Sequence, residues 1–309
     1  MNPSQNEFNQ MNDTNKPFFP SAAQLSYRIG GITFGLHADR GLRIALEKEL
    51  RAFEVTADSC EVNLQIGWAD SLEIPKSNLL FHSGGLWSLF AEPTGYRFSF
   101  LAPLVGMTPY KEAWFDSEYR IGRVLLSREY FDADRPVYPL EYPLDELLMI
   151  HRLSRAEGVE VHAVGISDDQ GRGHLFLGHS GAGKSTTARL WIDRPGVKIL
   201  SDDRIILRAR EGRICMYGTP WHGDAGIATP DCAPLTGIYL LEKGKSNELD
   251  PLPPGRAAAE LFARSFVTHH SEEGIRSTLD FLDRVASQVP CSIFRFVPDE
   301  SAVEAICRG

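Results

Sequence analysis

The sequence of 309 residues lacks the features that mark several large classes of protein. Its five cysteines are scattered without a C-x-x-C pair, which argues against a zinc site and against a disulfide framework. No apolar run approaches the roughly 18 residues of a membrane-spanning helix. The first residues have neither the basic nor the apolar segment of a signal peptide, so we expect a cytoplasmic protein with reduced thiols.

Positive charge is also in deficit. The chain has 32 Lys and Arg against 41 Asp and Glu, a net charge of −9 at pH 7. An acidic chain repels nucleic-acid phosphates and anionic lipid, so we expect neither nucleic acid nor membrane among its partners. The apolar fraction of 43% and the charged fraction of 24% are those of an ordinary globular protein. The oligomeric state stays open.

Three regions follow one another along the chain. Residues 1–20 are rich in Asn, Gln, Ser and Pro with little to bury, and we expect them to be disordered. Residues 21–140 consist of short alternating segments between Gly, Pro and Asp turns, which predict half-buried strands. One helix is expected over residues 41–52. The strands are expected at 31–36, 61–66, 85–90 and 96–100. This region therefore reads as a β-rich α+β domain, in which we identify no catalytic constellation.

The pattern changes near residue 141. A helix is predicted from Pro143, followed by two strands over 159–166 and 173–177 that a short turn joins into a hairpin. A hairpin at this position predicts a mixed rather than a purely parallel sheet. Further strands are expected at 197–203, 204–208, 213–217, 237–241 and 292–297, and helices at 256–270, at 274–289 and from Ser301. Residues 141–309 therefore read as a second, α/β domain.

The second strand of that hairpin leads into the segment Gly178–Ser185, which reads G-H-S-G-A-G-K-S and fits the P-loop pattern at every required position. Its glycines allow backbone N–H groups to surround a phosphate, and the following helix adds the positive end of its dipole. Lys184 would reach the β- and γ-phosphates and Ser185 would ligate Mg²⁺. The alternative is a glycine-rich turn before a helix, but the complete motif and its flanks favour phosphate binding. The expected nucleotide-binding residues are Gly178, His179, Ser180, Gly181, Ala182, Gly183, Lys184, Ser185 and Thr186.

Two carboxylates follow the apolar strand at 197–201. Asp202 and Asp203 form the Walker-B type of arrangement, in which a strand beside the P-loop ends in an acidic ligand for Mg²⁺. Adjacent residues of a strand point to opposite faces, so the two side chains should have different roles. His162 lies on the strand paired with the P-loop strand, where it is either a site residue or an ordinary strand histidine.

These elements, in this order, resemble the C-terminal kinase domain of HPr kinase/phosphorylase: His162 within its strand, then G-x-S-G-x-G-K-S, then Leu200-Ser201-Asp202-Asp203. That domain shares one P-loop fold with the ATP-dependent phosphoenolpyruvate carboxykinases. The resemblance runs from about Tyr142 to the C-terminus, and the segment 289–299 also looks like the tail of HPr-kinase-like proteins, some of which are linked to peptide modification.

The resemblance implies an α/β fold, with a P-loop kinase domain on a mixed sheet over residues 141–309. It implies ATP and Mg²⁺, with His162 near the phosphates and Lys184 on them. It implies Ser185 and Asp203 at the metal and Asp202 as the base toward an acceptor serine. In HPr kinase an acidic residue follows the P-loop serine. Here Thr186 and Thr187 follow Ser185, which is closer to the carboxykinases. From this resemblance we infer neither HPr as the substrate of this chain nor a phosphorylase activity.

Three functions are compatible with these residues. The first is a kinase that moves the γ-phosphoryl group of ATP to a hydroxyl, with a serine of a peptide or protein as acceptor. The second is a small-molecule kinase of the same fold, and the third is a regulatory nucleotide-binding module. The intact set of Lys184, Ser185, Asp202 and Asp203 favours an enzyme. The sequence leaves open whether residues 218–226 line the pocket and whether Arg204 balances the carboxylates or touches phosphate.

Overall fold

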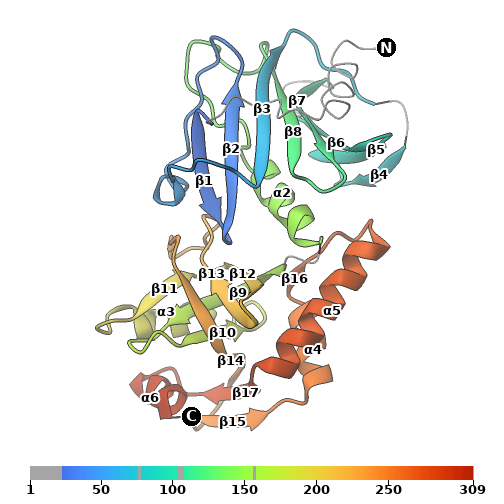
Figure 1. Ribbon diagram of the computed structural model, residues 1–309. Helices are drawn as coiled ribbons and strands as arrows, with labels where there is room; N and C mark the ends of the chain where they lie inside the picture. The colour runs from blue at the N-terminus through green and yellow to red at the C-terminus, as the bar shows by residue number, and fades with distance from the viewer. Residues whose placement is uncertain (1–22, 76–77, 103–107, 156–157, 309) are drawn as a thin grey trace. The chain divides into compact units, whose positions relative to one another are not determined.

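The computed structural model describes residues 23–75, 78–102, 108–155 and 158–308 (Figure 1). The N-terminal segment expected to be disordered lies outside these residues. By its internal contacts the chain divides into two compact units, with the second unit beginning at Met149 and also including Ile29–Gly31. This division falls within helix α2 (Leu144–Leu153). The predicted domain boundary after residue 140 stays a prediction, because a division by contacts does not test whether either part folds alone.

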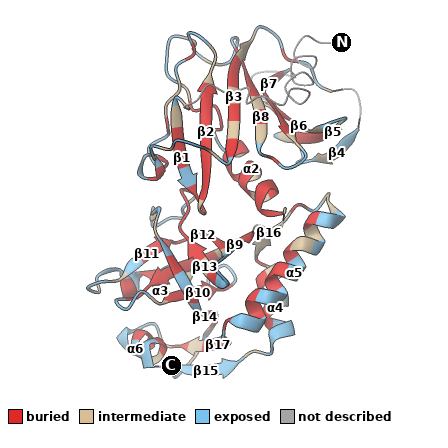
Figure 2. Ribbon diagram, viewed as in Figure 1, coloured by how far each residue is buried: buried red, intermediate tan, exposed pale blue. Residues whose placement is uncertain are grey.

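The first unit is built on one mixed eight-stranded sheet, in the order β1-β2-β3-β8-β7-β6-β5-β4. The pairs β2–β3 and β3–β8 are parallel, and the strands from β8 to β4 pair antiparallel. Nearly all of β2 is buried, whereas β4 is largely exposed (Figure 2). The strands are β1 (Leu25–Ile29), β2 (Ile32–Ala38), β3 (Val62–Ala69), β4 (Leu79–His82), β5 (Trp87–Glu92), β6 (Gly95–Leu101), β7 (Pro109–Asp116) and β8 (Ile121–Ser127). The β-rich character expected of this region is confirmed.

The helix predicted over residues 41–52 is wrong. The structure has only a 3₁₀ turn, η1 (Arg51–Phe53), at the end of this segment. Residues 43–45 are extended instead, because Ala45 N donates to Val137 O at 3.0 Å and Val137 N donates to Arg43 O at 3.0 Å. Pairing with a distant segment therefore overrides the local helical pattern. Three leucines of this segment are buried: Leu42, Leu46 and Leu50.

The second unit contains the predicted mixed sheet. Its strands follow the order β10-β9-β12-β13-β14-β17-β15, and β14 also pairs with β10, which closes the strands from β10 to β14 into a ring. The predicted β9–β10 hairpin is present, while β10–β14 and β14–β17 are parallel. The strands are β9 (Gly158–Ser167), β10 (Gly173–Leu177), β11 (Lys198–Ser201), β12 (Arg204–Arg210), β13 (Arg213–Tyr217), β14 (Cys232–Lys243), β15 (Glu248–Pro251), β16 (Ser265–Phe266) and β17 (Cys291–Phe296).

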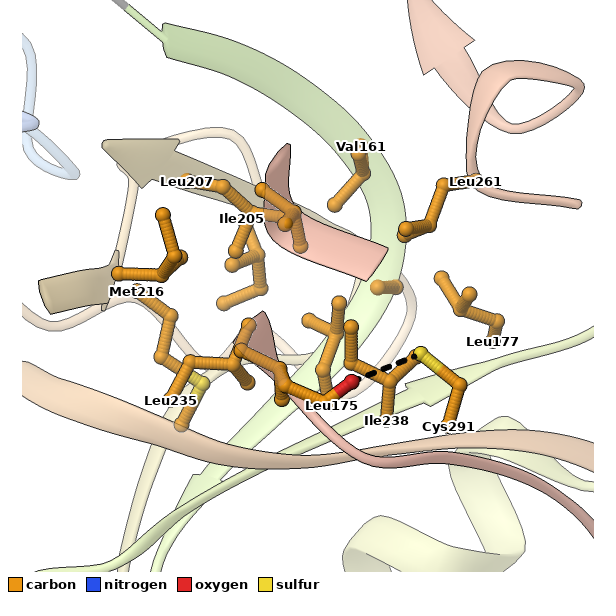
Figure 3. Packing of buried hydrophobic residues seen from close by; sticks show 14 of the residues in the cluster. Val161, Leu175, Leu177, Ile205, Leu207, Met216, Leu235, Ile238, Leu261 and Cys291 are labelled. Atoms are coloured by element: carbon orange, nitrogen blue, oxygen red, sulfur yellow. Dashed lines mark hydrogen bonds between the residues drawn. The ribbon is translucent and has the colours of Figure 1, made fainter. Parts of the chain in front are cut away.

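Helices cover both faces of this sheet, because apolar side chains alternate along its strands. Val161, Leu175 and Ile238 belong to one core, which fills the ring (Figure 3) and extends to α4 (Pro254–Phe262) and α5 (Glu272–Gln288). The alternate residues of the strands, such as Phe176 next to Leu175, belong to a second core with α3 (Lys184–Ile192) and α6 (Glu300–Arg308). The unit therefore has three layers, as expected for an α/β protein. No helix in the described ranges is long and apolar enough to span a bilayer.

Two details of this unit differ from expectation. The helix predicted over residues 256–270 ends at Phe262, because the next residues pair with β9: Ser265 with Val161, and Phe266 with Glu160. The strand before the two aspartates is not adjacent to the P-loop strand. Instead β9 lies between β10 and β11, and its Gly165 pairs with both strands.

The turn of the β9–β10 hairpin depends on a buried carboxylate, Asp168, whose side chain is 1% exposed. It accepts hydrogen bonds from Arg172 Nε at 2.7 Å and from His174 Nε2 at 3.1 Å, and from the backbone N–H groups of residues 170 and 172. Burial works against the charged form, but these donors outweigh it and hold the pKa of Asp168 below its usual value.

We expect Asp168→Asn to lower the free energy of unfolding by about 2–4 kcal/mol, because the amide places a donor against donors in a buried site. Urea denaturation at pH 7 measures the loss. Because the pKa is lowered in the folded state, the contribution is present above about pH 4 and is lost as the pH falls through the folded value. The free energy of unfolding of Asp168→Asn should therefore fall less than that of wild type as the pH is lowered through this range. Asp169→Asn, an exposed neighbour, is the control and should stay within about 0.5 kcal/mol of wild type.

Candidate active site

The P-loop connects the end of β10 at Leu177 to the start of α3 at Lys184. Gly181 and Gly183 have φ of 77° and 112°, which favour glycine. A Cβ on Gly183 would also lie 2.6 Å from the ring of Phe296, so no side chain fits there. The first turn of α3 leaves backbone N–H groups without helical partners. The sequence thus produces a loop and helix start that can hold an anion.

Lys184 lies across this loop. Its Nζ donates to Gly178 O at 2.8 Å and to His179 O at 3.4 Å. Burial, together with the nearby charge of Arg264, holds the pKa of Lys184 below its usual value, although Asp203 opposes this effect. These two contacts hold the ammonium group against the backbone of the loop.

The two aspartates lie in the link between β11 and β12 and have different partners. Asp202 is 5% exposed, and its two carboxylate oxygens accept hydrogen bonds from Gly223 N at 3.0 Å and Ala225 N at 2.9 Å. Asp203 is partly exposed and pairs with the side chains of His162 and Arg204. Asp202 therefore anchors the 218–226 loop, whereas Asp203 belongs to a charged cluster at β9.

His162 and Asp203 meet because His162 pairs with Arg204 across the β9–β12 ladder. The Nδ1 atom of His162 lies 3.0 Å from Oδ1 of Asp203, and since a carboxylate only accepts, Nδ1 carries the hydrogen. Burial works against the charge of Asp203, but this hydrogen bond and the charge of Arg204 outweigh it and hold the pKa of Asp203 below its usual value. Arg204 also contacts Glu160 at 3.5 Å, so it balances carboxylates rather than lining the cleft.

Sequence reasoning missed Arg264, which follows α4. Its side chain is 6% exposed, and Nη1 donates to Glu260 Oε2 at 2.7 Å. Nη2 lies 3.1 Å from His179 Nε2, and because a guanidinium only donates, this ring nitrogen accepts. The backbone oxygen of Arg264 accepts from His162 N at 2.7 Å. One buried cation thus connects the P-loop to β9, and no local sequence signal marks such a residue.

A cleft of about 480 Å³ lies at these residues, and neither Arg204 nor Arg264 lines it. Of the predicted site residues, Gly178 and Ala182 do not line it, while Gly223 and Asp224 of the loop at 218–226 do. Asp224 was not singled out from the sequence. The lining residues are His162, His179, Ser180, Gly181, Gly183, Lys184, Ser185, Thr186, Asp202, Asp203, Gly223 and Asp224. The cleft therefore brings the P-loop and its lysine together with carboxylates, a combination that suits transfer of a phosphoryl group to a hydroxyl.

Comparisons with known proteins give no family for the chain. No family model matches it, and no curated protein matches it. Among solved structures it shows a slight likeness to the Hpr(Ser) kinase/phosphatase from Coxiella burnetii, at 16% identity and a TM-score of 0.30, over 48% of this chain and 93% of that one. Nothing about activity is taken from a likeness this slight.

Proposed function

We propose that this protein is an ATP- and Mg²⁺-dependent kinase that transfers the γ-phosphoryl group to a hydroxyl, with a serine of a peptide or protein as the acceptor. One observation supports it above the others: most of the P-loop, including Lys184 and Ser185, lines the same cleft as Asp202 and Asp203. The resemblance of the motifs to HPr kinase agrees with this proposal.

The residues of the cleft fit both a triphosphate and a magnesium ion. Gly181 leaves open space beside the start of α3, and Lys184 supplies the charge. The exposed hydroxyl of Ser185 and the carboxylate of Asp203 are oxygen ligands of the kind Mg²⁺ prefers. When bound, the metal would supply positive charge that offsets the charge developing on the phosphate oxygens.

The mechanism we propose assigns one task to each side chain. Lys184 and the N–H groups of the loop hold the phosphate oxygens, which lowers the cost of charge in a loose transition state. Asp202 accepts the proton of the acceptor hydroxyl, and its oxygens keep lone pairs free besides those bonded to the loop. His162 fixes the orientation of Asp203 through Nδ1. A carboxylate suffices as the base because the proton leaves late in such a transition state.

A regulatory nucleotide-binding module has no need for a carboxylate placed to receive a proton. Asp202 is buried yet lines the cleft, and this placement favours the kinase. The small-molecule kinase differs only in the acceptor, which the assay below compares directly.

Two measurements on the full chain test the proposal. Calorimetry should show binding of ATP in the presence of Mg²⁺, and γ-labelled ATP should transfer label to serine peptides in preference to small hydroxyl compounds. The absence of ATP binding would rule out all three functions. Binding without transfer to any hydroxyl would leave the regulatory module, and transfer only to small compounds would favour the small-molecule kinase.

A further inference from the structure

The loop at 218–226 contributes Gly223 and Asp224 to the lining of the cleft, and its position is fixed by hydrogen bonds. The N–H groups of Gly223 and Ala225 donate to the two oxygens of Asp202. A Cβ on Gly223 would lie 3.0 Å from Asp202 Oδ2 and 3.3 Å from Asp203 Cβ, so the loop contacts both carboxylates as closely as glycine permits. The residue between the two donors, Asp224, is therefore held at a defined place beside the base.

Asp224 presents an unpaired carboxylate at this place. It is exposed and lines the cleft, and within the described ranges its side chain makes no hydrogen bond or ion pair. No group of three or more His, Cys, Asp or Glu side chains in those ranges converges on a common point, so Asp224 is not a corner of a preformed metal cage with Asp202 and Asp203. A fixed, unpaired carboxylate in a cleft is suited to bind an organic cation.

The side chains at the cleft carry charge of both signs. Lys184 lies at the P-loop, where the buried Arg264 contacts His179, and these cations attract the phosphates of ATP. Asp202 is bonded to the loop and Asp203 is paired with His162 and Arg204, whereas Asp224 has no partner within the described ranges. At Asp224 an acidic group of the acceptor would be repelled and a basic group would be attracted.

We propose that Asp224 forms an acceptor subsite for a cationic side chain, so that the substrate is a peptide in which Lys or Arg flanks the phosphorylated serine. This inference depends on the proposed kinase function and narrows its substrate class. Asp224 determines specificity rather than taking part in the chemical step, because the proton acceptor is Asp202. The contribution is that of a partly exposed ion pair, about three- to tenfold in kcat/KM.

A set of matched peptides tests the subsite. Each has one central serine in a glycine background, with Lys, Ala or Glu fixed in turn at each flanking position. Wild type, Asp224→Asn, Asp224→Lys and the control Asp280→Asn are assayed with γ-labelled ATP. Asp280 is an exposed residue of α5 outside the cleft, so its variant makes the same change of charge elsewhere. The KM for ATP and the Mg²⁺ concentration at half-maximal rate are measured alongside.

Wild type and Asp280→Asn should favour the Lys peptide at one or more positions by about three- to tenfold. Asp224→Asn should remove this preference and Asp224→Lys should reverse it toward Glu, with the ATP and Mg²⁺ dependence unaltered. Three outcomes would overturn the subsite while leaving the kinase in place. Asp224→Asn could keep the preference for the Lys peptide, or wild type could show no preference for charge. Asp224→Asn could also change the Mg²⁺ requirement without losing the preference. ATP binding with no peptide phosphorylated would overturn the peptide acceptor and the subsite together.

Discussion

Replacing Lys184 with alanine should lower kcat for phosphoryl transfer by about 10²–10³-fold or more and weaken binding of ATP with Mg²⁺. The ammonium group donates to Gly178 O at 2.8 Å, and Lys184 lines the cleft in which the phosphates would bind. Its loss removes a fixed positive charge from a half-enclosed cleft, where charge is poorly replaced by water. Transfer of label from γ-labelled ATP measures the rate and calorimetry measures the affinity.

The matched control for this variant is Arg189→Ala, which removes an exposed cation from the same helix outside the cleft. It should leave both quantities within about twofold. Urea denaturation of both variants checks that the fold persists, because Lys184 also holds the loop through its two carbonyl contacts. A folded Lys184→Ala protein that transfers phosphate within tenfold of wild type would contradict the role of the P-loop.

Where local signals and tertiary structure agree, the sequence was sufficient to predict the structure. The β9–β10 hairpin, the helix after the P-loop and the strands β12 and β13 on either side of Glu211-Gly212 all appear as expected. Each is set by residues close in sequence: apolar alternation, a turn with glycine, or a glycine-rich loop before a helix. The P-loop belongs to this class, since its geometry depends on its own glycines.

Where contacts between distant segments decide the backbone conformation, the prediction from the sequence was wrong. Leu42, Leu46 and Leu50 have helical spacing, but the extended pairing of their neighbours with Val137 decides the backbone. The same reason ends α4 early, since β9 captures Ser265. The site shows this limit as well. Tertiary folding brings Asp224 to the cleft and Arg264 to His179 of the P-loop, and no motif or spacing marks either residue.

Asp202 provides the second large effect, and the structure changes how it must be measured. We expect Asp202→Asn to lower kcat by about 10²-fold or more, because an amide cannot accept the acceptor's proton, while affinity for ATP stays within a few-fold. The same change also places an amide NH₂ against the N–H of Gly223 or Ala225, so one anchor of the loop is lost. A lower rate alone would therefore not separate the base from the anchor.

Two further variants separate these roles. Gly223→Ala keeps the carboxylate but crowds it, since its Cβ would lie 3.0 Å from Asp202 Oδ2 and the loop or the carboxylate must shift by a few tenths of an ångström. A rate loss near tenfold is expected from this misplacement alone. Asp203→Asn should instead raise the Mg²⁺ concentration needed for half-maximal rate. If Asp202→Asn lost no more than Gly223→Ala, the carboxylate would be an anchor of the loop and not the base. If folded Asp202→Asn turned over at the wild-type rate, Asp202 would be neither the base nor an anchor that the reaction needs. The proton would then leave by another route, because a kinase that gains its rate from positioning and charge neutralisation depends little on a base.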